Sequence, residues 1–222
     1  MNGGPNPKGI APTAISLERI KEILKEALPQ KTQERKTSLK SQDNQYFLEI
    51  RLPVEIAKKI KEMLSGLPAG IKMHFPENYH ITLIYFGAIG GELLKTIEAV
   101  KNILKNFKSF EIVIDGKKFK SGKVPGYPTK AFYFEIKDKG GEILKKIRTD
   151  LEKEVPNFQK EEFFPHLTVA TALPQIEERV IKEAEIKIKK DEKVKILVDK
   201  FRLTEVLRKS TGELVYKTKT QF

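Results

Sequence analysis

Two matching segments constrain this chain more than any other feature of its sequence. Residues 78–87 read NYHITLIYFG and residues 163–173 read FFPHLTVATAL, so each carries a His-x-Thr tripeptide within an apolar run typical of a β-strand. A predicted strand and a predicted helix precede each segment. These are 46–53 and 54–67 in the first copy, and 131–138 and 140–155 in the second.

The spacing between the two copies indicates a duplication. His80 and His166 lie 86 residues apart, as do Glu49 and Glu135, which we expect at matching places in the two preceding strands. A unit that recurs only twice favours a pseudo-symmetric domain over a solenoid. The predicted fold class is therefore α+β: a bilobal, pseudo-twofold duplication of antiparallel sheets, with helices packed outside and a central cleft.

The rest of the chain divides into further predicted elements. Residues 1–45 form an N-terminal extension, with an amphipathic helix over 16–28 and a polar linker over 29–45, and the duplicated domain covers 46–222. The domain's remaining predicted elements are a helix over 90–107, a strand over 109–119, a helix over 175–186, and C-terminal strands with a hairpin turn at STGE, 210–213.

Charge and composition narrow the range of possible binding partners and sites. Lys and Arg number 42 against 30 Asp and Glu, a net charge of +12, which favours a polyanion such as RNA; a lysine-rich surface without a partner is the alternative. The chain has no cysteine, which excludes disulfides and thiolate metal sites. We find no secretory signal pattern and no apolar run long enough to span a bilayer. We expect a cytoplasmic monomer.

The two tripeptides carry a specific chemistry. Because side chains alternate along a strand, His80 shares a face with Thr82, and His166 with Thr168, followed by the small Ala170 and Ala172, which leave room for a ligand. Two imidazoles in opposite protonation states supply a general base and a general acid, and threonine hydroxyls bond phosphate oxygens. Two histidines without supporting carboxylates or cysteines make a poor metal site, so we expect no metal and no cofactor. The alternative is a core role for each histidine.

These segments resemble a known family. PENYHITLIYFG is similar to PENLHLTLxFLG, and FFPHLTVA to FxPHLTLA, the motifs of the two-histidine phosphoesterases, in particular the LigT-like RNA 2′,3′-cyclic phosphodiesterases, also called 2′-5′ RNA ligases. The resemblance covers about residues 46–222. It implies metal-independent hydrolysis of a 2′,3′-cyclic phosphate of RNA or a nucleotide, with His80, Thr82, His166 and Thr168 as the active site. It further implies a 2′-phosphate product, with His166 as base and His80 as acid.

Other activities and contacts stay open at this stage. Ligation through a 2′-5′ linkage, cleavage of a 2′-5′-linked oligonucleotide, and nucleotide binding without turnover are the alternatives. The segment 116–130, a Gly/Pro-rich loop of lysines and aromatic rings, suits single-stranded RNA and offers Lys123, Tyr127 and Lys130 as substrate contacts. A solvated loop with Phe119 in the core is the other interpretation. We expect His74 to be structural or peripheral.

Overall fold

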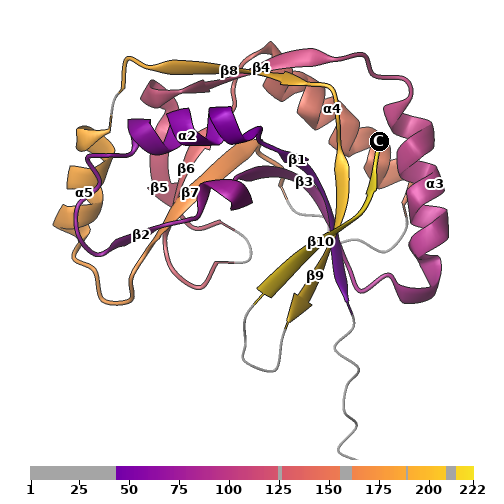
Figure 1. Cartoon of the computed structure of the whole chain (residues 1–222), viewed down its shortest axis with the longest axis horizontal. Helices are drawn as coiled ribbons and strands as arrows, with labels where there is room; N and C mark the ends of the chain where they lie inside the picture. The colour runs from indigo at the N-terminus through magenta and orange to yellow at the C-terminus, as the bar shows by residue number, and fades with distance from the viewer. Residues whose placement is uncertain (1–43, 125–126, 156–161, 189, 209–213) are drawn as a thin grey trace, which may run out of the picture. The chain divides into compact units, whose positions relative to one another are not determined.

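The computed structural model describes residues 44–124, 127–155, 162–188, 190–208 and 214–222 (Figure 1). The helix predicted over 16–28, nearly all of the predicted linker and the turn predicted at 210–213 lie outside the described residues. The division of the chain near Tyr46 therefore stays a prediction. None of the helices in the described ranges is both long enough and apolar enough to cross a membrane.

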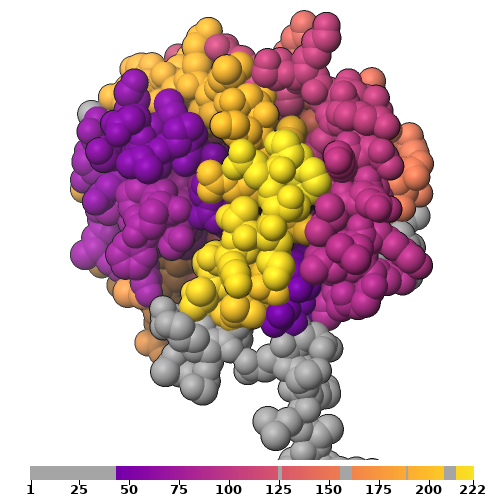
Figure 2. Space-filling model, turned by 45° about the vertical axis from the view of Figure 1, so that its right-hand side comes forward, coloured from indigo at the N-terminus to yellow at the C-terminus, as the bar shows by residue number. Residues whose placement is uncertain are grey.

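The first sheet joins the two ends of the described chain. Its order is β10–β9–β1–β3, and every neighbouring pair is antiparallel. The C-terminal strands (yellow) thus run beside β1 (indigo) in Figure 1, and Figure 2 shows them at the surface between the indigo and magenta parts of the chain. Its strands are β1 (Gln45–Arg51), β3 (His80–Gly87), β9 (Arg202–Arg208) and β10 (Leu214–Gln221).

The second sheet carries the second motif and has the order β2–β7–β6–β5, again antiparallel. β2 is too short to leave a periodic signal, and the sequence did not predict it. The strands are β2 (Ile71–Met73), β5 (Phe119–Gly122), β6 (Ala131–Glu135) and β7 (His166–Ala172), while β4 (Phe110–Asp115) and β8 (Lys193–Val198) pair separately. β3 and β7 contact each other, so the two motif strands come together between the sheets.

Four α-helices lie in the described residues: α2 (Val54–Met63), α3 (Leu93–Leu104), α4 (Lys139–Glu154) and α5 (Glu178–Lys187). α3 and α4 pack on each other, α4 also contacts β3 and β4, and α5 contacts β5 (Figure 1). The carboxylate of Asp138 explains where α4 begins, because it accepts hydrogen bonds from the amides of Gly141 at 2.8 Å and Val113 of β4 at 2.7 Å. A Cβ on Gly140 would collide with the carbonyl of Glu111, so glycine permits this close approach.

The helix boundaries follow the prediction within a few residues. The predicted helix over 54–67 ends earlier, at Met63, where the amide of Leu64 bonds to the carbonyl of Lys61 and tightens the last turn. The predicted helix over 90–107 begins with a 3₁₀ turn, Gly90–Glu92, before α3. The architecture is therefore the predicted α+β arrangement of antiparallel sheets with helices.

A bulge follows the threonine in both motif strands. The pairing of β1 with β3 passes over Leu83, and the pairing of β6 with β7 passes over Val169. After Val169 the partly exposed position of β7 becomes Thr171, while Ala170 and Ala172 are buried. The prediction that these two alanines continue the open face beyond Thr168 is wrong, because the extra residue in the bulge reverses the alternation.

Strand register also corrects the predicted equivalence of the two glutamates. Glu49 lies opposite Thr82, whereas Glu135 lies opposite His166. The position that corresponds to Glu49 in the second sheet is Tyr133, which lies opposite Thr168. Equal spacing along the chain misleads here because the intervening helices differ in length, 10 residues in α2 and 16 in α4.

Candidate active site

Both motifs present the histidine and the threonine on one face of their strand. His80 and Thr82 are half-buried while Ile81 between them is fully buried, and His166 and Thr168 flank the buried Leu167 in the same way. This is the alternation that the sequence predicts. β3 contacts β7, and the charge of His80 acts on His166, so the two motifs lie close together.

The two imidazoles are held in the same way. Nδ1 of His80 lies 2.7 Å from the carbonyl oxygen of Asn78, and Nδ1 of His166 lies 2.8 Å from that of Phe164, in each case two residues earlier in the chain. A carbonyl oxygen only accepts hydrogen bonds, so each Nδ1 carries the proton and donates it. The nitrogen that gains or loses a proton is therefore Nε2 in both rings.

The electrostatic surroundings lower the pKa of both rings. Burial lowers the pKa of His80 from its ordinary value of 6.5, and Glu49 and the bond to Asn78 only partly offset this. Burial also lowers the pKa of His166, and the positive charge of His80 lowers it further. The two imidazoles are thus near enough for one charge to disfavour the other, as an acid–base pair requires.

Different aromatic rings surround the two histidines. The ring of His166 stacks on Phe164 with centroids 4.5 Å apart and meets the edge of Tyr133 at 5.6 Å. The ring of His80 lies 5.3 Å from Phe47 of β1 and 6.5 Å from Tyr216 of β10. Aromatic packing restricts the rotation of both imidazoles and thereby helps to fix the direction of each Nε2.

Tyr127 is the predicted substrate contact that the structure brings to the motifs. Its side chain hydrogen-bonds that of Thr168, and burial raises its pKa to about 12, so its hydroxyl stays protonated at neutral pH. Its ring stacks on His74, with centroids 5.7 Å apart and planes 16° apart. Tyr127 therefore forms part of the wall beside the second motif.

His74 lies beside Tyr127 in this wall, and its structural or peripheral role stays a prediction. Its amide donates to the carbonyl of Val169 at 2.8 Å, which continues the pairing of β2 with β7. Burial lowers the pKa of His74, and the charge of His80 lowers it further. The sequence did not predict this placement, because it depends on β2, whose three residues left no pattern.

The two lysines predicted as substrate contacts in segment 116–130 have exposed or partly exposed side chains. The ammonium of Lys130 pairs with Glu178 of α5 at 2.6 Å, and Lys123 is exposed. The segment contains β5 and is not the continuous loop predicted. Phe119 of β5 is buried and stacks on Phe132, so the interpretation that places it in the core is confirmed.

Comparison with known proteins identifies the family. Residues 52–209 match the family described as the 2′-5′ RNA ligase superfamily. The chain belongs to this superfamily. A curated relative from Archaeoglobus fulgidus, named RNA 2′,3′-cyclic phosphodiesterase, is 31% identical over 127 residues, which are 55% of this chain and 69% of that protein. The predicted membership of the two-histidine phosphoesterases is confirmed.

Two further comparisons agree with this assignment. A protein of the same name from Methanothermobacter thermautotrophicus is 39% identical over 59 residues, and the match covers 26% of this chain and about a third of that protein's length, 32%. The structure of E. coli LigT in complex with 3′-AMP aligns with a TM-score of 0.56 at 16% identity, covering 81% of this chain and 97% of that one. At this identity the structural likeness shows the fold of the superfamily.

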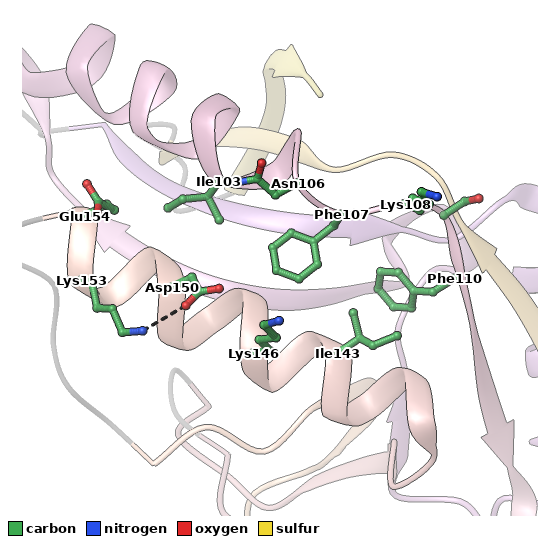
Figure 3. A pocket seen from close by; sticks show the side chains of 11 residues that line it. Ile103, Asn106, Phe107, Lys108, Phe110, Ile143, Lys146, Asp150, Lys153 and Glu154 are labelled. Atoms are coloured by element: carbon green, nitrogen blue, oxygen red, sulfur yellow. Dashed lines mark hydrogen bonds and ion pairs between the residues drawn. The ribbon is translucent and has the colours of Figure 1, made fainter.

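A second concave region lies apart from the superfamily's motifs, between the end of α3 and α4. It is a cavity of about 550 Å³ with Phe107, Phe110 and Ile143 on its apolar side (Figure 3). Lys146 lies over the ring of Phe107, and Lys153 pairs with Asp150 at 3.1 Å. Its lining includes no histidine.

Metal-binding potential is low in the part of the chain that the structure describes. Within it, no group of three or more His, Cys, Asp or Glu side chains is placed to hold a metal ion. Stable protein metal sites use three or four such ligands.

Proposed function

We propose that this protein hydrolyses 2′,3′-cyclic phosphate ends of RNA or of nucleotides, without a metal ion, and leaves a 2′-phosphate. One observation carries the proposal: two imidazoles, each fixed through Nδ1 to a backbone carbonyl, keep Nε2 available on neighbouring strands beside a threonine hydroxyl. The names of the two archaeal relatives, RNA 2′,3′-cyclic phosphodiesterase, support the same substrate class.

The proposed reaction is a single displacement at phosphorus. His166 Nε2 takes a proton from water as the water oxygen bonds to phosphorus, and the bond from phosphorus to the ribose 3′ oxygen breaks. His80 Nε2 gives its proton to that departing oxygen, which leaves as a 3′-hydroxyl. The product is a 2′-phosphate monoester, and exchange with solvent returns His166 to its neutral form and His80 to its protonated form.

Hydroxyl groups supply the proposed stabilisation of charge on the phosphate oxygens. Thr82 and Thr168 lie two residues beyond the histidines on the same strand faces, so their hydroxyls point into the same site. Tyr127, bonded to Thr168, adds a third donor that stays protonated. Donors fixed before the reaction stabilise developing negative charge without reorganising, which is the basis of oxyanion stabilisation.

The proposed substrate contacts are ranked by the surroundings of each side chain. Tyr127 lies against Thr168 and contacts the substrate near the phosphate, with its ring and that of His74 as a stacking surface for a base. Lys123 is exposed and meets the RNA backbone farther away. Lys130 is placed last, because Glu178 already neutralises its charge. The E. coli LigT complex with 3′-AMP supports a nucleotide ligand.

The test is to incubate the protein with 2′,3′-cyclic mononucleotides and with a cyclic-ended RNA in EDTA, and to locate the product phosphate by ³¹P NMR. We expect a 2′-phosphate from both, and none from the His166→Asn variant as a matched control. Binding of the nucleotide without turnover would instead assign the protein to the binding-only class. A 3′-phosphate product would contradict the proposed leaving group.

A further inference from the structure

Glu49 is a fully buried carboxylate that lies directly behind the first motif. Its side chain has 0% exposure, and its strand position is opposite Thr82. One oxygen, Oε1, accepts three hydrogen bonds, from Nε and Nη2 of Arg51 at 3.0 and 2.8 Å and from the hydroxyl of Thr204 at 2.9 Å. These bonds hold the carboxylate in one position and give it the hydrogen-bond partners that a buried charge needs.

The second oxygen of Glu49 faces His80. Oε2 is buried, has no hydrogen-bond partner among the described residues, and lies 3.7 Å from Nδ1 of His80. That nitrogen already donates to the carbonyl of Asn78 at 2.7 Å, and 3.7 Å is too long for a second hydrogen bond. The carboxylate therefore acts on the imidazole through its charge.

The second motif has a different neighbour at the same place. Tyr133 occupies the position opposite Thr168, and its ring packs against His166 at 5.6 Å. The nearest acidic residue of that strand, Glu135, is bound by Lys120 at 2.7 Å and Lys137 at 2.9 Å. His80 thus has a buried carboxylate beside it in addition to its aromatic neighbours, whereas the carboxylate opposite His166 is already paired with two lysines.

We infer that Glu49 is a positioning residue that fixes His80 as the proton-carrying member of the pair and thereby leaves His166 to act as the base. The assignment of His80 as acid and His166 as base rests on the hydrolysis proposed above. The electrostatic effect of Glu49 on His80 does not depend on that function. The groups that face His80 are Glu49 and Arg51 from β1, Tyr216 from β10, and the other two histidines. Glu49 is the group among them that favours the imidazolium.

Proton affinities agree with this geometry. Glu49 raises the pKa of His80 against the stronger effect of burial, and Arg51 lowers it. A negative charge within about 4–6 Å raises the pKa of an imidazole by about 1–3 units. Because the positive charge of Arg51 opposes that of Glu49, we expect a shift in the pKa of His80 near the lower limit of this range. Replacing Glu49 by the isosteric Gln removes the charge and keeps an acceptor for Arg51.

The experiment follows the three histidine Cε1–H signals by NMR during a pH titration. We expect Glu49→Gln to lower the pKa of His80 by about one unit, equal to a tenfold change in protonation, and Arg51→Gln to raise it. Glu49→Asp, which keeps the charge, should retain most of the effect. Glu135→Gln is the matched control and should move neither His80 nor His166.

The pH dependence of hydrolysis gives the second readout. The alkaline limb, where the general acid loses its proton, should move to lower pH in Glu49→Gln and to higher pH in Arg51→Gln, which a loss of packing alone would not do. If Glu49→Gln does not fold, Arg51→Gln tests the inference instead, because it should shift the pKa of His80 and the alkaline limb in the opposite direction. An unchanged His80 titration in the folded variants overturns the inference even if hydrolysis is found. If the wild type hydrolyses nothing, the proposed function fails, and the titrations still decide whether Glu49 controls His80.

Discussion

Replacing each motif histidine by Asn separates the proposed chemistry from folding more cleanly than replacing it by Ala. The side-chain amide of Asn reaches about as far as Nδ1 of histidine, so His80→Asn and His166→Asn keep a donor for the carbonyls of Asn78 and Phe164. Both variants lack Nε2, the nitrogen that moves the proton. We expect each to lose about 10²–10⁴-fold in rate, the usual contribution of one general acid or base. This loss equals about 2.7–5.4 kcal/mol of transition-state stabilisation.

The structure predicts a smaller effect on stability. The side chain of His80 is only 20% exposed and packs on Phe47, so truncation to Ala loses contacts and leaves the carbonyl of Asn78 unbonded. A lost hydrogen bond of this kind costs about 1–3 kcal/mol, and the Asn variant avoids most of it. A domain stable by about 5–15 kcal/mol stays folded in either case. The Ala and Asn variants should therefore share one rate loss and differ in stability.

The assay compares initial rates on a 2′,3′-cyclic nucleotide with urea unfolding of the same samples. The double variant His80→Asn/His166→Asn should lose much less than the product of the single losses, because groups that act as a unit are not additive. Rates near wild type in the single Asn variants would refute the reasoning. So would a rate loss that follows the unfolded fraction, which would make both histidines core residues.

Further predictions concern metal, salt, acid and one buried arginine. Hydrolysis should survive EDTA, and loss on chelation with recovery on adding a divalent ion would contradict this. RNA affinity should fall steeply with salt, and Lys123→Gln should reduce the slope of log K against log salt by about one if that lysine meets a phosphate; an unchanged slope assigns it to solvent. Burial lowers the pKa of all three histidines from 6.5, so the unfolded chain binds more protons below this pH. Stability should therefore fall as pH drops below about 6.5, before the carboxylates titrate, and a flat urea midpoint between about pH 7 and 5 would contradict this. Arg148→Met should cost about 1–3 kcal/mol, because Arg148 Nη1 bonds the buried carbonyl of Leu83 at 2.8 Å; the exposed Arg179→Met serves as control, and equal midpoints would refute the role.

Local patterns in the sequence predicted most of the helices and strands and the two motifs. The alternation of apolar residues predicted both motif strands, and the repeated His-x-Thr placed a histidine and a threonine on one face of each. The helical periods of α2 and α4 were equally clear. These features are local, since they depend on residues a few positions apart, and a local pattern survives in the sequence whatever the rest of the chain does.

Tertiary structure decided what lies next to the motifs. Equal spacing suggested that Glu49 and Glu135 are equivalent, but strand register places Glu49 opposite Thr82 and gives the matching position in the second sheet to Tyr133. The side chain of Glu49 then lies 3.7 Å from His80. Tertiary structure also decided the place of His74, which only the pairing of β2 with β7 brings to the site. Register depends on bulges, loop lengths and contacts between distant segments, and none of these leaves a periodic trace in the sequence. For that reason the sequence predicted the acid–base pair, and only the fold showed which histidine has a buried charge beside it.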